Sequence, residues 1–436
     1  MLSVISNRTY RHLLAAQIVA LVGTGLATVA LGLLAYDLAG ANAGAVLGTA
    51  LAIKMIAYIG VAPVVGAFAD RLPRRAFLVA MDLTRAAIAL ALPFVDQIWQ
   101  IYVLIFVLQS ASAAFTPTFQ ATIPDVLPDE KDYTNALSLS RLAYDLENLL
   151  SPMLAAALLT VISFHWLFSG TSIGFVISAL LVLSVTLPRA VAAPRTGGVY
   201  TRTTRGMRIY LATPRLRGLL AVTLAAAAAS AMVIVNTVVI VRGQLGLSAT
   251  DVAFALAAYS GGSILAALAL PKILERFGDR LVMITAAVAL AVLLALLAGV
   301  TRAVGDTARY WPLLLVGWFA LGVAYSSAVT PGGRLLRRSA GTNDRPAVFA
   351  AQFALSHVCW LVAYPLAGWL GAGAGMTAAF VSLAVLAAIG ATAATIAWPR
   401  LDLETLSHEH DLPLDHPHLK GGDRSHSHAA KPQLAG

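Results

Sequence analysis

Six histidines near the C-terminus form the densest group of metal-binding side chains in this 436-residue chain. They occur as three His-x-His pairs with acidic residues between them. Neutral imidazole binds Zn, Cu, Fe and Ni, and a histidine-rich tract favours metal binding. Because prolines, glycines and charges surround the pairs, we expect no fixed fold, but a tail that captures metal and raises its local concentration. A solvated polar tail is the alternative. The candidate ligands are His408, His410, His416, His418, His426 and His428.

Charged residues inside long apolar segments form a second candidate group, because a charge at membrane depth costs about 2.5–3.5 kcal/mol. Lys54 lies near the centre of one such segment, and Asp145 and Glu147 lie in another. Arg141 and Asp145 share a helical stripe, whereas Glu147 points roughly 120° away from Arg141. Lys54 paired with Glu147 or with Asp145 is the structural interpretation. In the functional interpretation, one carboxylate exchanges a proton or binds a cation during transport. The two are compatible, since a pair that breaks on protonation couples proton and cargo.

Two further pairs of residues could do chemistry inside apolar segments. Asp82 and Arg85 are three residues apart and can face the same way. We interpret them first as a structural ion pair and second as part of the coupling path. His357 and Cys359 are possible ligands of a soft metal, although a lone membrane histidine is more often a hydrogen-bonded packing residue.

The composition is that of a membrane protein. Hydrophobic residues make up 59% of the chain and charged residues only 12%, against about 25% charged in soluble domains. The net charge of +9 does not indicate nucleic acid, because the basic residues cluster in alternate loops. That alternation places both termini in the cytoplasm. The single cysteine excludes a disulfide framework.

Apolar runs of about 20 residues mark membrane spans. We expect an all-α integral membrane protein with two six-helix halves, residues 1–187 and 217–400, joined by a basic loop over 188–216 and followed by a tail over 401–436. Two related halves are typical of secondary transporters with a substrate path between them. The expected spans lie near 12–38, 44–68, 76–96, 99–121, 137–161, 165–187, 217–241, 248–272, 281–300, 310–332, 346–371 and 375–398.

The stretch GAFADRLPRRAFL, between the second and third expected spans, carries a recognisable loop motif. It resembles the G-x-x-x-D-R-x-G-R-[RK] motif of the major facilitator superfamily, with Pro73 where that family prefers glycine. A degraded second copy follows the eighth span, at Pro271–Arg280. The resemblance implies alternating access, with the first loop latching one state. The residues that match the motif are Gly66, Asp70, Arg71, Arg74 and Arg75.

A narrower resemblance rests on YTNALSLSRLAYDLENLLSP and HEHDLPLDHPH, which look like segments of bacterial nickel-resistance permeases with histidine-rich C-termini. It implies proton-driven export of Ni²⁺ from the bacterial cytoplasm across the inner membrane, with Co²⁺ as a further candidate. We expect a monomer in the lipid bilayer, with no permanent cofactor and no nucleic-acid partner.

Two other functions fit the sequence. One is a drug or siderophore exporter with an incidental tail. The other is a membrane protein that buffers or senses metal without transporting it. An enzyme is not expected, because we find no nucleotide-binding loop, nucleophile–base signature or zinc-hydrolase motif.

Overall fold

The computed structural model describes residues 2–68, 73–188, 199–303, 307–340, 345–399, 405–409 and 425–429. The long apolar segments are helices, as expected where backbone groups must be satisfied without water. Within these ranges, nine helical stretches are long and apolar enough to cross a membrane. The expected all-helical membrane fold is therefore confirmed.

The first helix group contains the N-terminal helices. Asn7 caps α2 by accepting a hydrogen bond from the Tyr10 backbone N–H at 3.1 Å, and Asp129 caps α6 by accepting from the Asp132 N–H at 3.0 Å. Such caps satisfy donors that the first turn leaves free. The elements are α1 (Leu2–Ser6), α2 (Arg8–Ala39), η1 (Gly40–Asn42), α3 (Ala43–Phe68), α4 (Arg74–Ala91), η3 (Leu92–Phe94), α5 (Ile98–Val126), α6 (Glu130–Leu159) and α7 (Phe164–Leu183).

The second helix group follows the middle loop. Gly278 has φ 71° and ψ 161°, so α10 is two helices that meet at a kink. Two short helices, α8 and α12, were not predicted from apolar length because each is amphipathic and carries several arginines. The elements are α8 (Val199–Ala212), α9 (Pro214–Val238), the π-helical η4 (Val239–Gln244), α10 (Ala249–Ala303), α11 (Thr307–Val329), α12 (Gly332–Ser339), α13 (Arg345–Gly373) and α14 (Met376–Ala397).

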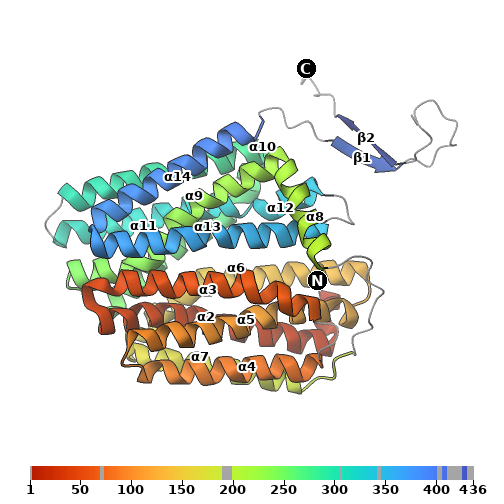
Figure 1. The fold of residues 1–436 in the computed structure, drawn as a ribbon, viewed down its shortest axis with the longest axis horizontal. Coiled ribbons are helices and arrows are strands. Elements are labelled where there is room, and N and C mark those ends of the chain that lie inside the picture. Colours follow the sequence, from red (N-terminus) through yellow and green to blue (C-terminus); the bar gives the residue numbers. More distant parts are fainter. Residues whose placement is uncertain are drawn as a thin grey trace.

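Figure 1 shows the two groups as stacked layers of roughly parallel helices, with α3 and α6 facing the second group. Across this junction α3 contacts α13, and α6 contacts α10. We call the end with the α2–α3, α6–α7 and α13–α14 connections the closed end. The opposite end, where α8 and α12 lie, we call the open end.

The tail contains two short strands, β1 (Thr405–Glu409) and β2 (Ser425–Ala429). They pair antiparallel, with His408 opposite His426 and Leu406 opposite His428. The prolines, glycines and charges of the tail predict no fixed fold. Most of those residues fall between the strands, in 410–424, which lies outside the described residues.

Candidate functional site

Two oppositely charged side chains near the middle of the first helix group lie within electrostatic range of each other. Lys54 of α3 and Glu147 of α6 interact electrostatically, and both side chains are half-buried. Gly25 of α2 makes room for this part of α6, because a Cβ on Gly25 would collide with the Ser151 side chain and lie 3.6 Å from Glu147 Cγ. The structure thus brings Lys54 to Glu147. For Arg141 and Asp145, only the backbone is described.

An aromatic cluster links this pair to the second helix group. Tyr58 lies one turn along α3 from Lys54, and its ring stacks on His357 of α13 at 5.3 Å and 12°. The Phe353 ring lies 4.1 Å from His357, and His357 Nδ1 lies 2.6 Å from the Phe353 carbonyl oxygen. The Lys54 charge also acts on His357. Sequence reasoning missed Tyr58 and Phe353, although each stands four residues from a residue it had chosen.

His357 and Cys359 do not share an environment. His357 faces Tyr58 of the first group, whereas Cys359 is buried and lies near Tyr210 of α8. Residues two apart on a helix point about 200° apart. Among the side chains that the structure describes, no group of three or more His, Cys, Asp or Glu could hold a metal ion. His410, His416 and His418 lie outside the described residues.

Asp82 and Arg85 form a salt bridge within α4, away from the junction of the two groups. Asp82 is fully buried and accepts a hydrogen bond from Ser178 of α7 at 2.7 Å. The Arg85 guanidinium lies between two rings, 4.3 Å from the centroid of Phe115 and 4.5 Å from that of Phe175. All the contacts of this pair are therefore inside the first helix group, which fits a structural role.

Each group has an ion pair at the open end. In the first group Arg74 pairs with Asp125 at the end of α5, and Arg75 donates to the Leu183 carbonyl. In the second group Asp279 pairs with Arg334 and lies 3.4 Å from Arg338. The residue next to the loop is thus basic in the first group, where it is Arg74, and acidic in the second, where it is Asp279.

Motif residues Asp70 and Arg71 lie outside the described residues, and Gly66 lies in α3. Sequence reasoning missed Asp125 and Asp279, because neither stands in a long apolar context. One residue of the second motif copy, Arg280, makes a contact at this end of the molecule. It donates a hydrogen bond to the Trp398 carbonyl oxygen at 2.9 Å.

At the closed end, the two groups touch through small residues and hydrogen bonds. A Cβ on Gly48 of α3 would lie 2.6 Å from the Tyr364 carbonyl oxygen of α13. Trp369 donates to Thr49 Oγ1 at 3.1 Å. Thr250 at the start of α10 donates to the Leu159 carbonyl oxygen at 3.1 Å. These contacts join α3 to α13 and α6 to α10.

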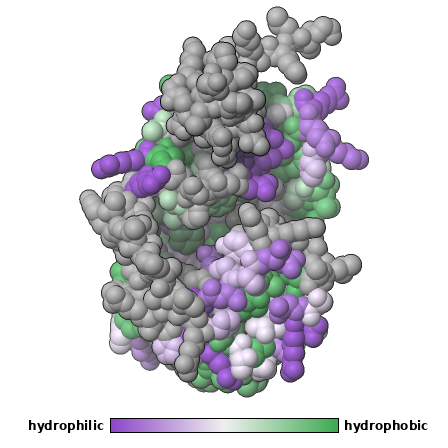
Figure 2. Space-filling model, turned by 90° about the vertical axis from the view of Figure 1, so that its right-hand side faces the viewer, coloured by the Kyte–Doolittle hydropathy of each residue, from purple (hydrophilic) through white to green (hydrophobic). Residues whose placement is uncertain are grey.

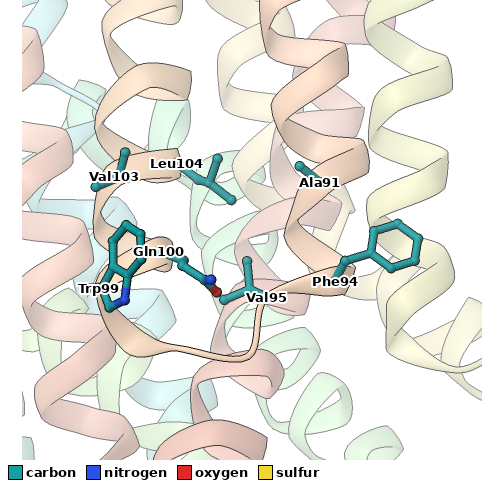
Figure 3. Close-up of a pocket in the computed structure, with 7 residues that line it drawn as sticks. All are labelled: Ala91, Phe94, Val95, Trp99, Gln100, Val103 and Leu104. Atoms are coloured by element: carbon teal, nitrogen blue, oxygen red, sulfur yellow. The ribbon is translucent and has the colours of Figure 1, made fainter.

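An open pocket lies between α4 and α5 near η3, as Figure 3 shows. It has no charged side chain, and it lies within the first group, so it does not resemble a transport site. Its lining residues are Ala91, Phe94, Val95, Trp99, Gln100, Val103 and Leu104.

The sequence profile of the Major Facilitator Superfamily matches residues 13–239 and 219–419. The chain belongs to the Major Facilitator Superfamily. This superfamily assignment confirms the resemblance drawn from the loop motif. The chain is thus a multi-pass membrane protein of a transporter superfamily.

Curated relatives of this superfamily member include transporters and efflux proteins. The uncharacterized MFS-type transporter YfiS of Bacillus subtilis is 28% identical over 127 residues, 29% of this chain and 30% of that protein. Macrolide efflux protein A of Enterococcus faecalis is 26% identical over 153 residues, 33% of this chain and 47% of that protein. These matches cover less than half of either relative. The MFS-type transporter YvqJ of B. subtilis is 24% identical over 81% of this chain and 83% of that protein.

Solved transporters share the fold. The nucleoside transporter NupG aligns with a TM-score of 0.66 at 14% identity, over 89% of this chain and 98% of that chain. A bacterial homolog of the human lysosomal transporter Spinster, inward-facing and unoccupied, aligns with a TM-score of 0.68 at 13% identity, over 89% and 97%. At such identities the likeness concerns the fold alone.

Proposed function

We propose that this chain is a proton-coupled secondary exporter that works by alternating access in a bacterial inner membrane. We further propose twelve spans, in two six-helix halves over 1–187 and 217–400. The stretch Arg8–Ala62 supplies two of them, as parts of α2 and α3. The kinked α10 supplies two more, and α6 is added despite its charges. Both termini then lie at the open end, on the cytoplasmic side that its arginines favour, and the protein acts as a monomer.

The observation that carries the coupling is the electrostatic interaction between Lys54 and Glu147. A carboxylate that exchanges protons must be reachable by water. It must also interact with a cation that is attracted only while the carboxylate is ionised. Glu147 is half-buried and interacts with Lys54. Protonation of Glu147 would release Lys54, whose neighbour His357 belongs to the other helix group. Movement of a proton is thereby linked to the junction that must open and close.

The proposed cargo is a divalent transition metal, with nickel as the first choice and cobalt as the second. The tail supports this choice. Its strand register sets His408 directly opposite His426, and places His428 two residues along the same strand. Three residues of a type that binds Ni²⁺ thus occupy neighbouring backbone positions of the two strands.

An organic cargo is the second candidate, favoured by a specific observation. The junction carries the aromatic rings of Tyr58 and Phe353, which suit an apolar molecule better than an ion. Three relatives are named as macrolide efflux protein A. On this reading the tail is incidental to transport.

The test is uptake into inverted inner-membrane vesicles with an imposed proton gradient, comparing Ni²⁺, Co²⁺ and Zn²⁺ with and without a protonophore. We expect gradient-dependent Ni²⁺ accumulation, and we expect Glu147→Gln to reduce it to the background of empty vesicles. Glu275→Gln is the matched control, because Glu275 is exposed on α10. Full Ni²⁺ uptake by correctly inserted Glu147→Gln would contradict the coupling role.

Tail variants separate the cargo hypotheses in the same vesicles. We expect His408→Ala/His426→Ala to lower Ni²⁺ binding to the purified chain and to slow uptake at low Ni²⁺ more than His416→Ala/His418→Ala does. Export of a macrolide with no metal uptake would favour the organic cargo. Metal bound by the tail, with no uptake of any cargo, would indicate the buffering or sensing protein.

A further inference from the structure

We infer that the open end of the second helix group binds the headgroups of anionic phospholipids. The inference goes beyond the proposed cargo and does not depend on it. The binding surface consists of α8, the first turn of α9, α12 and the two sides of the α10 kink, and we call it the basic face.

The helix α8 is fixed to the bundle and does not hang in a loose loop. Gly206 packs so closely on α13 that a side chain there would collide with the Ala347 backbone. Tyr210 is fully buried and donates a hydrogen bond to Gln352 of α13. Burial also raises the pKa of the Tyr210 hydroxyl, so the hydroxyl remains a donor. With Tyr210 inside, Arg208 is exposed on the outer side of the helix.

The helix α12 presents arginines in the same way. Leu335 and Leu336 are buried at 3% and 4% exposure, while Arg337 and Arg338 are exposed. Arg215, in the first turn of α9, donates to the Arg338 carbonyl oxygen at 2.7 Å. The contact joins α12 to the segment that follows α8, so the arginines of the two short helices lie on one continuous surface.

The basic face carries far more positive than negative charge. Asp279 is already paired with Arg334, and Glu275 is the exposed acid that the described residues place beside the kink. Figure 2 views this end of the molecule and shows hydrophilic side chains projecting around its upper part. The exposed basic residues are Arg205, Arg208, Arg217, Lys272, Arg276, Arg337 and Arg338.

The open end of the first group differs in its charge balance. Among the side chains described there, three exposed arginines, Arg8, Arg11 and Arg75, stand against two acids, Asp129 and Asp132. Positive loops orient a membrane protein if they lie on one side of the membrane. That rule does not require the basic residues to be concentrated in one of the two helix groups. The excess on the second group therefore calls for an anionic partner at that position.

Exposed apolar side chains among the charges identify the partner as lipid. Ile273, Phe277 and Leu281 are 37%, 50% and 51% exposed at the kink, beside Lys272 and Arg276. The Arg276 guanidinium lies 5.3 Å from the Phe277 ring centroid. Basic side chains next to exposed apolar ones suit the bilayer interface, where the apolar part enters the acyl region and the charge meets phosphate. A soluble anion would leave these apolar surfaces in water.

The acidic tail is the other occupant to consider. Its described strands pair with each other, and Figure 1 shows them projecting away from the bundle. They thus leave the basic face to another partner.

The test uses the full chain in mixed detergent–lipid micelles, with native mass spectrometry to count bound phosphatidylglycerol against phosphatidylcholine. We expect selective retention of phosphatidylglycerol that falls with salt. Lys272→Gln/Arg276→Gln/Arg337→Gln should lose at least about fivefold in phosphatidylglycerol affinity, since each basic residue near an anionic surface contributes about that factor. The control Arg8→Gln/Arg11→Gln should bind like the unaltered chain.

Two additional experiments identify which molecule occupies the basic face. Inorganic phosphate in excess should not displace phosphatidylglycerol, and displacement would assign the face to a soluble anion. Deletion of 401–436 should leave lipid retention unchanged, and a rise above that of the full chain would show that the tail occupies the face. If the triple variant does not fold, Arg337→Gln alone replaces it. Equal lipid binding by that variant and the control would overturn the inference.

Discussion

At the scale of single residues, burial separates two kinds of intramembrane ion pair. Asp82 and Arg85 are almost fully enclosed, at 0% and 5% exposure, and contact only their own helix group. Lys54 and Glu147 are half-buried, and Lys54 also acts on His357 across the junction. An enclosed pair is held in one state by its neighbours. A pair whose charge also acts on the second helix group can change partner.

The Asp82–Arg85 pair gives a prediction about stability. Asp82→Asn leaves the Arg85 charge buried between two rings, and removal of one partner of a buried pair costs about 3–5 kcal/mol. We expect a clear fall in the thermal unfolding midpoint in detergent. Asp82→Asn/Arg85→Gln should recover part of the loss and should transport at the normal rate per folded molecule. A double variant that is stable but inactive would instead place this pair in the coupling path.

At the scale of elements, the seam between α3 and α13 depends on glycine. Gly44 and Gly48 are one helical turn apart, and Gly368 of α13 packs against the Gly44 backbone. Small residues at this spacing let helix backbones approach closely in lipid. Asn236 of α9 reinforces the seam: it donates to the Ala367 carbonyl oxygen at 3.0 Å, and its Oδ1 would lie 2.8 Å from a Cβ on Gly44.

A larger residue in this seam should open the closed end. Gly48→Val would push α3 away from the Tyr364 carbonyl, whereas Gly60→Val is the matched control, since a Cβ on Gly60 meets nothing within 4 Å. The reporter is Val239→Cys, at a buried position on this end, in a Cys359→Ser background. We expect faster labelling by a membrane-impermeant maleimide in Gly48→Val only. Equal labelling in both variants would mean that the seam does not seal this end.

At the scale of the whole molecule, the polar and close backbone contacts described between the two groups gather at the closed end. They include Thr49 with Trp369 and Thr250 with Leu159. The charged contacts of the open end, such as Arg74 with Asp125, stay within one group. An exporter that alternates access must break the closed-end contacts in each cycle.

A reversible cross-link tests this requirement. Thr49→Cys/Trp369→Cys, with Cys359→Ser, should be joined by a short bis-methanethiosulfonate reagent that spans the space of the lost indole, because the parent side chains are in hydrogen-bond contact. We expect the cross-link to stop transport and reduction to restore it. Thr49→Cys/Cys359→Ser should keep its transport after the same treatment. Unchanged transport by the fully cross-linked protein would contradict alternating access at this end.

The sequence by itself determined the class of fold and the positions of the helices. Apolar runs as long as a bilayer is thick must be helices, because lipid offers no partner for a backbone amide. The expected span 346–371 corresponds to α13, and 375–398 corresponds to α14. The loop motif was also readable, because charges between two apolar runs stand out. The nickel cargo and the tail's part in transport stay predictions.

Only the tertiary structure decided which residues meet. Helical periodicity gives the direction of Glu147 relative to Arg141, but it does not give the helix that Glu147 faces. The sequence gives no signal that distinguishes Tyr58 and Phe353 from other core residues. Their importance follows from the packing of α3 against α13, which brings the two rings together. The short helices α8 and α12 were missed because amphipathic segments owe their stability to packing, here through Gly206 and Leu335. Contacts between distant segments depend on how helices pack. Packing is determined by the shapes of several helices together, so no single segment of the sequence predicts it.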